Sequence, residues 1–363
     1  MNSKALQRAL RAGTPVLIWG PPGVGKTATV YALGRSLGLP VESVIASIRD
    51  PADFGGFPVP AQDGLRLEPM AWAKRLAEAG RGILFLDEIS TAPPAVQAAL
   101  LRVVLERVVG DLHLPPDVKI IAAANPPDMA AGGWDLAPPL ANRFTHLYWK
   151  LDPMAWVEEF PGYWGQAPDV PGLDGELWAR ARAMVAAFIR ARPSLLLQVP
   201  KSAEQQGKAW PSPRSWDNAS RLLASVMMDG EEATEAVELI AGAVGEGPGL
   251  EFVAWARELS LPDPEELLAN PDSFKLPPRG DQAYAVLSAV ASAAVSKLTA
   301  ERWRAAWKIM AAAADQGAID IAASAVRTLA RARDRERFAT PSEARKFIPL
   351  LQQAGLMTVH VKG

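Results

Sequence analysis

A glycine-rich segment near the N-terminus has the residue types and the spacing of a phosphate-binding loop. Residues 20–27 read Gly-Pro-Pro-Gly-Val-Gly-Lys-Thr, which fits the pattern G-x-x-x-x-G-K-[ST]. The glycines allow a tight turn whose backbone N–H groups point at phosphate oxygens, and the helix expected to follow adds its positive dipole end. We expect Lys26 to neutralise the β- and γ-phosphates of ATP and the Thr27 hydroxyl to ligate Mg²⁺. The residues expected to contact the nucleotide are Gly20, Pro21, Pro22, Gly23, Val24, Gly25, Lys26, Thr27 and Ala28.

Two carboxylates follow an apolar run further along the chain. The run Ile83–Leu86 ends in Asp87 and Glu88. At the carboxyl end of a buried parallel strand, such side chains lie at the sheet edge where ligands bind. We expect Asp87 to join Thr27 in the Mg²⁺ shell and Glu88 to orient and polarise the attacking water. Taken alone, the pair also fits a helix cap, but its place downstream of the phosphate-binding loop favours a hydrolytic site.

These motifs resemble those of AAA+ ATPases, and the resemblance implies roles for two further residues. Asn125 follows the apolar run Ile120–Ala124, where AAA+ proteins carry sensor 1, a polar residue that helps to position the hydrolytic water. Arg143 resembles the arginine finger of the MoxR-like and dynein-related branch, which reaches the nucleotide of a neighbouring subunit. The alternatives are a turn residue at a strand end for Asn125 and a surface salt bridge for Arg143.

Three other arginines are weaker candidates. Arg214, in the segment Trp210–Trp216, resembles the sensor 2 arginine that contacts the γ-phosphate from the helical lid of MoxR-like proteins. The alternative is a residue at a helix start with structural duties alone. Arg102 and Arg107 follow the acidic pair on a predicted helix and fit a charge at a subunit interface, although a solvated helix face explains them better.

Two glycine-containing insertions interrupt the alternation of strands and helices. Phe54–Leu67 contains Asp63-Gly64 and Arg107–Leu114 contains Gly110-Asp111, and both patterns predict hairpins. Members of the MoxR-like branch resemble one another in having hairpins at these two places, where they face a central pore. Phe54 and Phe57 would then grip a polypeptide client; the alternative is that both rings pack locally.

The order of apolar runs and helical patterns predicts the architecture. Over the first 150 residues the two alternate, which indicates a parallel α/β sheet of P-loop NTPase type with helices on both faces. A proline- and glycine-rich stretch, Pro161–Gly175, precedes a region that is helical in pattern. We expect an AAA+ core at 1–150, a linker and all-helical lid at 151–250, and a helical C-terminal extension at 251–363. The expected strands are Val16–Trp19, Val41–Ala46, Ile83–Leu86 and Val118–Ala124, and the first long helix is Lys26–Leu37.

Composition excludes several kinds of site. The chain has no cysteine, so disulfides and thiolate chemistry are excluded, and His113, His146 and His360 are too scattered for a structural zinc site. The net charge of −2 gives no overall basic field for nucleic acid. No apolar stretch approaches the roughly 20 residues of a membrane span, and the N-terminus lacks the pattern of a secretory signal. We therefore expect a cytoplasmic protein.

The resemblance implies an ATP-hydrolysing ring, most simply a hexamer, that remodels or activates a protein client. Proteins of the MoxR-like type often act with a partner that carries a von Willebrand factor A-type domain. Two alternatives remain at this point: a nucleotide-dependent assembly scaffold with little turnover, and a nucleic-acid motor. The complete set of acidic and polar motifs disfavours the first, and the near-neutral charge disfavours the second.

Overall fold

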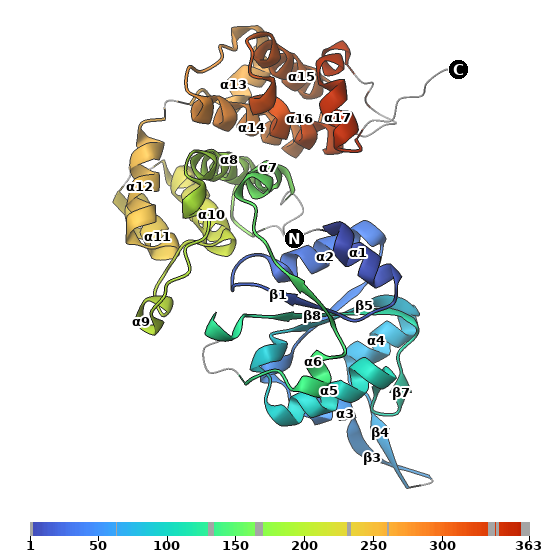
Figure 1. The fold of residues 1–363 in the computed structure, drawn as a ribbon. Helices are drawn as coiled ribbons and strands as arrows, with labels where there is room; N and C mark the ends of the chain where they lie inside the picture. The colour runs from blue at the N-terminus through green and yellow to red at the C-terminus, as the bar shows by residue number, and fades with distance from the viewer. Residues whose placement is uncertain are drawn as a thin grey trace, which may run out of the picture. The chain divides into compact units, whose positions relative to one another are not determined.

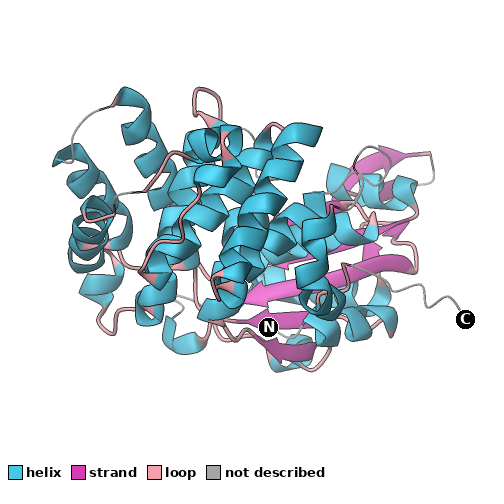
Figure 2. Ribbon diagram, turned by 90° about the horizontal axis from the view of Figure 1, so that it is seen from above, coloured by secondary structure: helices cyan, strands magenta, loops and turns pink. Residues whose placement is uncertain are grey.

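The chain divides into two compact units, Met1–Leu151 and Asp152–Gly363 (Figure 1). The computed structural model describes residues 3–62, 64–129, 134–163, 170–230, 234–259, 261–332, 338 and 341–356. Within these ranges the first unit holds all the strands and the second is helical, as the colours of Figure 2 show.

Five parallel strands form the central sheet of the first unit, in the order β2-β5-β8-β1-β9. Their middle residues are buried on both faces, which is why the sequence shows them as continuous apolar runs rather than as an alternating pattern. Strand β8 lies between β5 and β1, although the chain reaches it last of the three. The strands are β1 (Val16–Trp19), β2 (Val41–Ile45), β5 (Arg81–Asp87), β8 (Asp117–Ala124) and β9 (Thr145–Tyr148).

Helices cover both faces of this sheet, because successive side chains of a strand point to opposite sides. Val16 and Ile18 pack with α1 and α2, whereas Leu17 between them packs with α3, α4, α5 and α6 (Figure 1). The helices are α1 (Ser3–Arg11), α2 (Lys26–Leu37), α3 (Ala52–Gly55), α4 (Ala71–Ala79), α5 (Pro94–Glu106) and α6 (Pro138–Ala141).

Both insertions form two-stranded antiparallel hairpins, β3–β4 (Phe57–Ala61 and Gly64–Glu68) and β6–β7 (Val108–Val109 and Leu112–His113). The turn of the second hairpin packs against the base of the first. The backbone N–H of Asp111 donates to the Leu67 carbonyl at 3.0 Å, and its carboxylate accepts from the Leu67 N–H at 2.8 Å. A Cβ on Gly56 would lie 2.6 Å from the Gly110 Cα, so this contact requires glycine at position 56.

The expectation that Phe54 grips a client is wrong. Phe54 lies on α3 rather than in the hairpin, is 1% exposed, and packs on Trp72 with ring centroids 6.2 Å apart. Phe57, by contrast, is 46% exposed at the start of β3. The apolar side chains free to meet another molecule on this hairpin therefore include Phe57 and Leu65, not Phe54.

The described part of the second unit is built of helices. Its largest apolar cluster surrounds Trp303 and Trp307, which are nearly fully buried, and includes Phe347. The helices are α7 (Pro153–Tyr163), α8 (Gly175–Ala191), α9 (Ala203–Gln206), α10 (Pro213–Asp229), α11 (Thr234–Val244), α12 (Glu246–Arg257), α13 (Pro264–Ala269), α14 (Gly280–Ser296), α15 (Ala300–Asp315), α16 (Ile319–Ala332) and α17 (Ile348–Gln353). The predicted class, a parallel α/β sheet with helices on both faces followed by a helical region, is confirmed.

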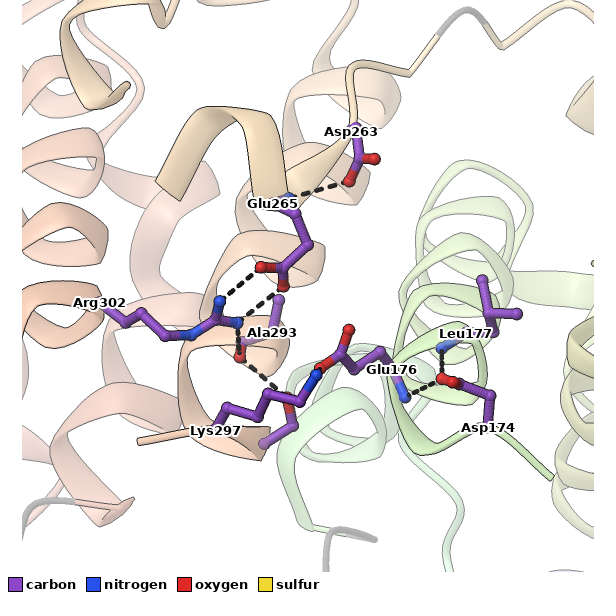
Figure 3. Close-up of polar contacts among 9 residues, drawn as sticks. Asp174, Glu176, Leu177, Asp263, Glu265, Ala293, Lys297 and Arg302 are labelled. Atoms are coloured by element: carbon purple, nitrogen blue, oxygen red, sulfur yellow. Dashed lines mark hydrogen bonds and ion pairs between the residues drawn. The ribbon is translucent and has the colours of Figure 1, made fainter. Parts of the chain in front are cut away.

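Charged side chains fasten the ends of several of these helices (Figure 3). Asp174 caps α8 by accepting from the backbone N–H of Glu176 at 2.8 Å. Lys297 pairs with the Glu176 carboxylate at 2.7 Å. Arg302 donates to Glu265, which ties α15 to α13, and these hydrogen bonds lower the pKa of the Glu265 carboxyl.

Helix α7 contains a proline that deprives a buried carbonyl of its usual donor. Pro161 has no N–H, so the carbonyl of Val157, four residues earlier, cannot make its intrahelical hydrogen bond. The Tyr284 hydroxyl of α14 donates to this carbonyl at 2.7 Å. Both Val157 and Tyr284 are fully buried, and burial raises the pKa of Tyr284 to about 12, so the hydroxyl keeps its proton.

We therefore predict that Tyr284→Phe lowers the free energy of unfolding by about 1–3 kcal/mol, because it leaves a buried carbonyl without a donor. Urea denaturation of the full chain, followed by circular dichroism, measures this loss. Tyr31→Phe is the matched control, since Tyr31 on α2 is 38% exposed. Equal stability of the two variants would contradict the assignment.

Candidate nucleotide-binding site

The functional residues predicted from the first 130 residues meet at the carboxyl ends of the sheet strands. Leu86 of β5 lies opposite Ala122 of β8, and Trp19 of β1 lies opposite Ala124, so the three strands end within about two residues of one another. The phosphate-binding loop follows β1, Asp87 is the last residue of β5 with Glu88 directly after it, and Asn125 follows β8. Strand order and register therefore bring together segments that lie about 100 residues apart in the chain.

Lys26 is the buried cation at these strand ends. It is 8% exposed and opens α2 directly after Gly25, whose φ of 92° is a conformation that glycine adopts without strain. Its ammonium group donates to the carbonyl oxygens of Gly20 at 2.6 Å and Pro21 at 3.0 Å. It also donates to Asn125 Oδ1 at 2.8 Å. Asn125 thus contacts the phosphate-binding loop through the residue expected to bind phosphate.

Thr27 and Asp87, the two residues predicted to ligate Mg²⁺, lie in direct contact. The Thr27 hydroxyl donates to Asp87 Oδ2 at 2.7 Å, and the Glu88 backbone N–H donates to Asp87 Oδ1 at 3.0 Å. A hydroxyl and one oriented carboxylate are hard oxygen donors that suit Mg²⁺. Among the described residues no group of three or more His, Asp or Glu side chains is placed to hold a metal, so a cation here needs phosphate or water oxygens as well.

Glu88 lies beside this pair with an unusual backbone. Its φ of 55° places it in the left-handed region, which is uncommon for a residue with a side chain and often marks functional sites. The carbonyl of Glu88 accepts from the Thr91 hydroxyl at 2.9 Å, which helps to hold this conformation. The side chain is exposed, and its Oε2 accepts from the Ser47 hydroxyl at 2.7 Å.

Ser47 was not found by sequence reasoning. It lies in a short 3-10 helix, Ala46–Ile48, that directly follows β2, the strand paired with β5. A polar residue after an apolar run was the available signal. Its meaning depended on knowing that β2 is the neighbour of β5, which sequence spacing does not reveal.

Gly20 begins the phosphate-binding loop where the backbone is crowded. A Cβ at this position would lie 2.7 Å from the Cβ of Trp149, the residue that follows β9. The Trp149 N–H donates to the Trp19 carbonyl at 2.6 Å, so the two backbones are held together at this point. Glycine is required here by contact between β9 and the loop, in addition to the turn itself.

Arg143 lies at the opposite ends of the strands, the amino ends. Arg143 precedes β9, whose first residue, Thr145, lies opposite Val16, the first residue of β1. The phosphate-binding loop, in contrast, follows the last residue of β1. Its guanidinium donates to the Pro139 carbonyl of α6 at 2.9 Å. The structure therefore places Arg143 away from the phosphate-binding loop of its own chain, at the amino ends of the strands.

A buried glutamine, also missed by sequence reasoning, fixes the start of α6. Gln97 of α5 is 1% exposed; its side chain donates to the Ala92 carbonyl at 3.0 Å and accepts from the Ala137 N–H at 2.7 Å. Leu140 of α6 is 1% exposed in the core. These contacts anchor the short helix that carries the partner of Arg143.

The remaining arginines have separate surroundings. Arg214 is exposed in the first turn of α10, whose start is capped by Ser212 and Ser215, and it belongs to the second unit. Arg102 donates to the Gly110 carbonyl at 3.2 Å. Arg107 is half-buried and donates to the Pro115 carbonyl at 2.9 Å; burial lowers its pKa. Arg107 thus supports the second hairpin rather than lying on a solvated face.

The crowding at Gly20 gives a testable prediction. Gly20→Ala should weaken nucleotide binding by about tenfold or more, because overpacking typically costs about 1–3 kcal/mol and here must displace the loop or β9. Isothermal titration of ATP and ADP into each variant measures the affinity. Gly175→Ala is the control, since a Cβ there meets nothing within 4 Å. Unchanged affinity in Gly20→Ala would show that the loop absorbs the methyl group.

Comparison with known proteins finds one family for the first unit. The profile of the AAA domain of the dynein-related subfamily matches residues 15–144, a range that contains the phosphate-binding loop, Asp87, Glu88, Asn125 and Arg143. Midasin of Giardia intestinalis is 28% identical over 155 residues, which are 40% of this chain and 3% of that protein. The human ATPase family gene 2 protein homolog B is 35% identical over 121 residues, 31% of this chain and 15% of that protein.

A third relative is bacterial. The denitrification regulatory protein NirQ of Pseudomonas aeruginosa is 31% identical over 131 residues, 34% of this chain and 50% of that protein. The matches thus span half or less of the length of these three relatives. Among solved structures, the RuvB Holliday junction branch migration motor of Thermotoga maritima is a weak likeness, with a TM-score of 0.39 and 17% identity over 99% of this chain and 88% of that chain. Residues 15–144 of the chain are therefore identified as an AAA domain of the dynein-related subfamily.

Proposed function

We propose that this protein hydrolyses ATP with the help of Mg²⁺, in a ring of identical subunits, and uses the cycle to remodel or activate a protein client. The observation that carries the proposal is the meeting of Lys26, Thr27, Asp87, Glu88 and Asn125 at one sheet edge. Among the described residues, no helix is both long and apolar enough to span a membrane. A cytoplasmic location is part of the proposal.

The side chains at this edge suit separate tasks in phosphoryl transfer. Lys26 would exchange its carbonyl acceptors for phosphate oxygens, and the loop N–H groups would bind the remaining phosphate charge. Thr27 and Asp87 would hold Mg²⁺, which neutralises charge on the β- and γ-phosphates when bound. Glu88 would accept a proton from the attacking water, and its exposure allows a water to approach.

The ring is supported by the position of Arg143. An arginine at the amino ends of the strands lies on the wrong side of the sheet for the phosphate-binding loop of its own chain. It suits a finger that completes the site of a neighbouring subunit. The likeness to MoxR-like proteins further suggests a hexamer, a protein client and a partner with a von Willebrand factor A-type domain.

The roles of the second unit stay proposals as well. We propose that residues 151–250 form a linker and lid whose Arg214 acts as sensor 2, and that 251–363 form a C-terminal extension. The exposed position of Arg214 in the first turn of α10 leaves its guanidinium accessible to a ligand.

Binding and turnover should be separable by two substitutions. Lys26→Ala should weaken ATP affinity about 10- to 100-fold, because charge-assisted hydrogen bonds contribute roughly 1.5–3 kcal/mol. Glu88→Gln should keep ATP affinity within about threefold and lower kcat by at least about 100-fold, as loss of a general base does. Titration calorimetry and steady-state phosphate release measure the two effects. A scaffold with little turnover would instead show the same slow release in parent and Glu88→Gln proteins.

Subunit mixing tests the arginine finger. Arg143→Ala should lower kcat by about 10³-fold or more while leaving ATP affinity intact. Glu88→Gln subunits still carry Arg143, so mixing them with Arg143→Ala subunits should restore hydrolysis at the sites of the Arg143→Ala subunits. A mixture no more active than its two components would exclude a finger that acts between subunits.

A further inference from the structure

The side chain of His146 makes two hydrogen bonds to segments with different tasks. Its Nδ1 accepts from the indole Nε1–H of Trp19 at 2.9 Å, and its Nε2 lies 2.9 Å from the Ala141 carbonyl oxygen. Trp19 immediately precedes Gly20, the first residue of the phosphate-binding loop, and Ala141 is the last residue of α6. The imidazole of His146 thus links the loop to the helix beside Arg143.

Chemistry determines which tautomer makes this link. The indole N–H only donates and the carbonyl oxygen only accepts, so Nδ1 must carry no proton and Nε2 must carry one. A neutral imidazole with its proton on Nε2 satisfies both partners at once. Turning the ring of His146 by half a turn about its Cβ–Cγ bond would put carbon atoms in the places of both nitrogens and lose both hydrogen bonds, so the two contacts determine its orientation.

The elements on either side of Arg143 are short. Helix α6 has one turn, and β9 is an edge strand of four residues that pairs only with β1 in the sheet. Arg143 lies between them, and its guanidinium is bonded to the Pro139 carbonyl of α6. Gln97 fixes the start of α6, while His146 contacts its last carbonyl, which also accepts from the Phe144 N–H at 3.2 Å.

We propose that Trp19 and His146 are positioning residues for Arg143, because their hydrogen-bonded bridge fixes the end of α6 relative to the phosphate-binding loop. The nucleotide site of a subunit would then control the position of the arginine that this subunit supplies to its neighbour. The proposal rests on the proposed function of Arg143 as a finger between subunits. Directly after β9, Trp149 lies against Gly20 and its N–H donates to the Trp19 carbonyl, so this segment has a second contact at the start of the loop. A shift of the loop is therefore passed to the segment that carries Arg143.

The test uses mixed rings in which one subunit donates the arginine and the other hydrolyses. Donors carry Glu88→Gln and acceptors carry Arg143→Ala. His146→Ala added to the donor should lower phosphate release by the mixture about tenfold or more, because small misplacements of a catalytic group have large effects on rate. The same substitution in the acceptor, whose arginine is already absent, should change the rate by less than about twofold.

Three further variants of the donor subunit separate the bridge from general destabilisation. Trp19→Phe keeps an aromatic ring but removes the indole N–H donor, and it should match His146→Ala. The two changes together should cost no more than either alone, since they break one bridge. His113→Ala on β7 is the matched control, because His113 is also an exposed histidine on a strand of the first unit. It should leave the mixture unchanged.

The outcomes distinguish the two levels of the proposal. The bridge is overturned, and the finger stands, if the parent mixture hydrolyses ATP but His146→Ala lowers phosphate release when the acceptor carries it. The same conclusion follows if His146→Ala lowers phosphate release in neither subunit. A parent mixture without restored hydrolysis overturns the finger, and the bridge with it. A readout independent of turnover is long-range ¹⁵N NMR of the full chain, in which three histidines need assignment. It should show His146 protonated on Nε2; protonation on Nδ1 overturns the bridge.

Discussion

The buried ammonium group of Lys26 is the constraint on which the first unit depends. An ammonium removed from water is costly unless oxygen acceptors surround it. Here the acceptors come from the loop carbonyls of Gly20 and Pro21 and from Asn125 at the end of another strand. Because β8 lies between β5 and β1, the same arrangement brings Asp87 to Thr27. The Lys26 ammonium, the Thr27 hydroxyl and the Asp87 carboxylate would thus already be in place when a triphosphate binds.

Sequence alone predicted the parts of this site that are local. The phosphate-binding loop requires glycines, a lysine and a hydroxyl within eight residues, and the helix that follows it begins at Lys26 and ends at Leu37, as predicted. The buried strands were recognised by their continuous apolar runs, which parallel sheets produce. The roles of Asn125 and Arg143 came from family resemblance, and the structure adds their positions, at opposite edges of the sheet.

The features that escaped prediction depend on contacts between distant segments. Strand β9 is short and mixes polar with apolar residues, because it is an edge strand with exposed side chains, so no apolar run marks it. Gln97 reads as one more polar residue of an amphipathic helix, yet it is buried because its amide satisfies the backbone around the start of α6. Phe54 looked like a hairpin residue, but the chain forms one more helical turn before β3 and buries the ring.

If Arg143 acts as a finger, its placement at the opposite strand ends from the phosphate-binding loop also constrains how subunits contact one another. A parallel sheet binds its ligands at the carboxyl ends of the strands, so a catalytic group at the amino ends would have to act on a different site. If that site belongs to the next subunit, each interface joins the amino edge of one sheet to the carboxyl edge of another, which is a head-to-tail contact. Such contacts close into rings or grow into helices, and they do not form two-fold dimers. In a ring built in this way, elements that run from the amino to the carboxyl ends of the strands connect the finger of a subunit to its own nucleotide site. Strand β9, with Arg143 before it and Trp149 against Gly20 after it, is such an element.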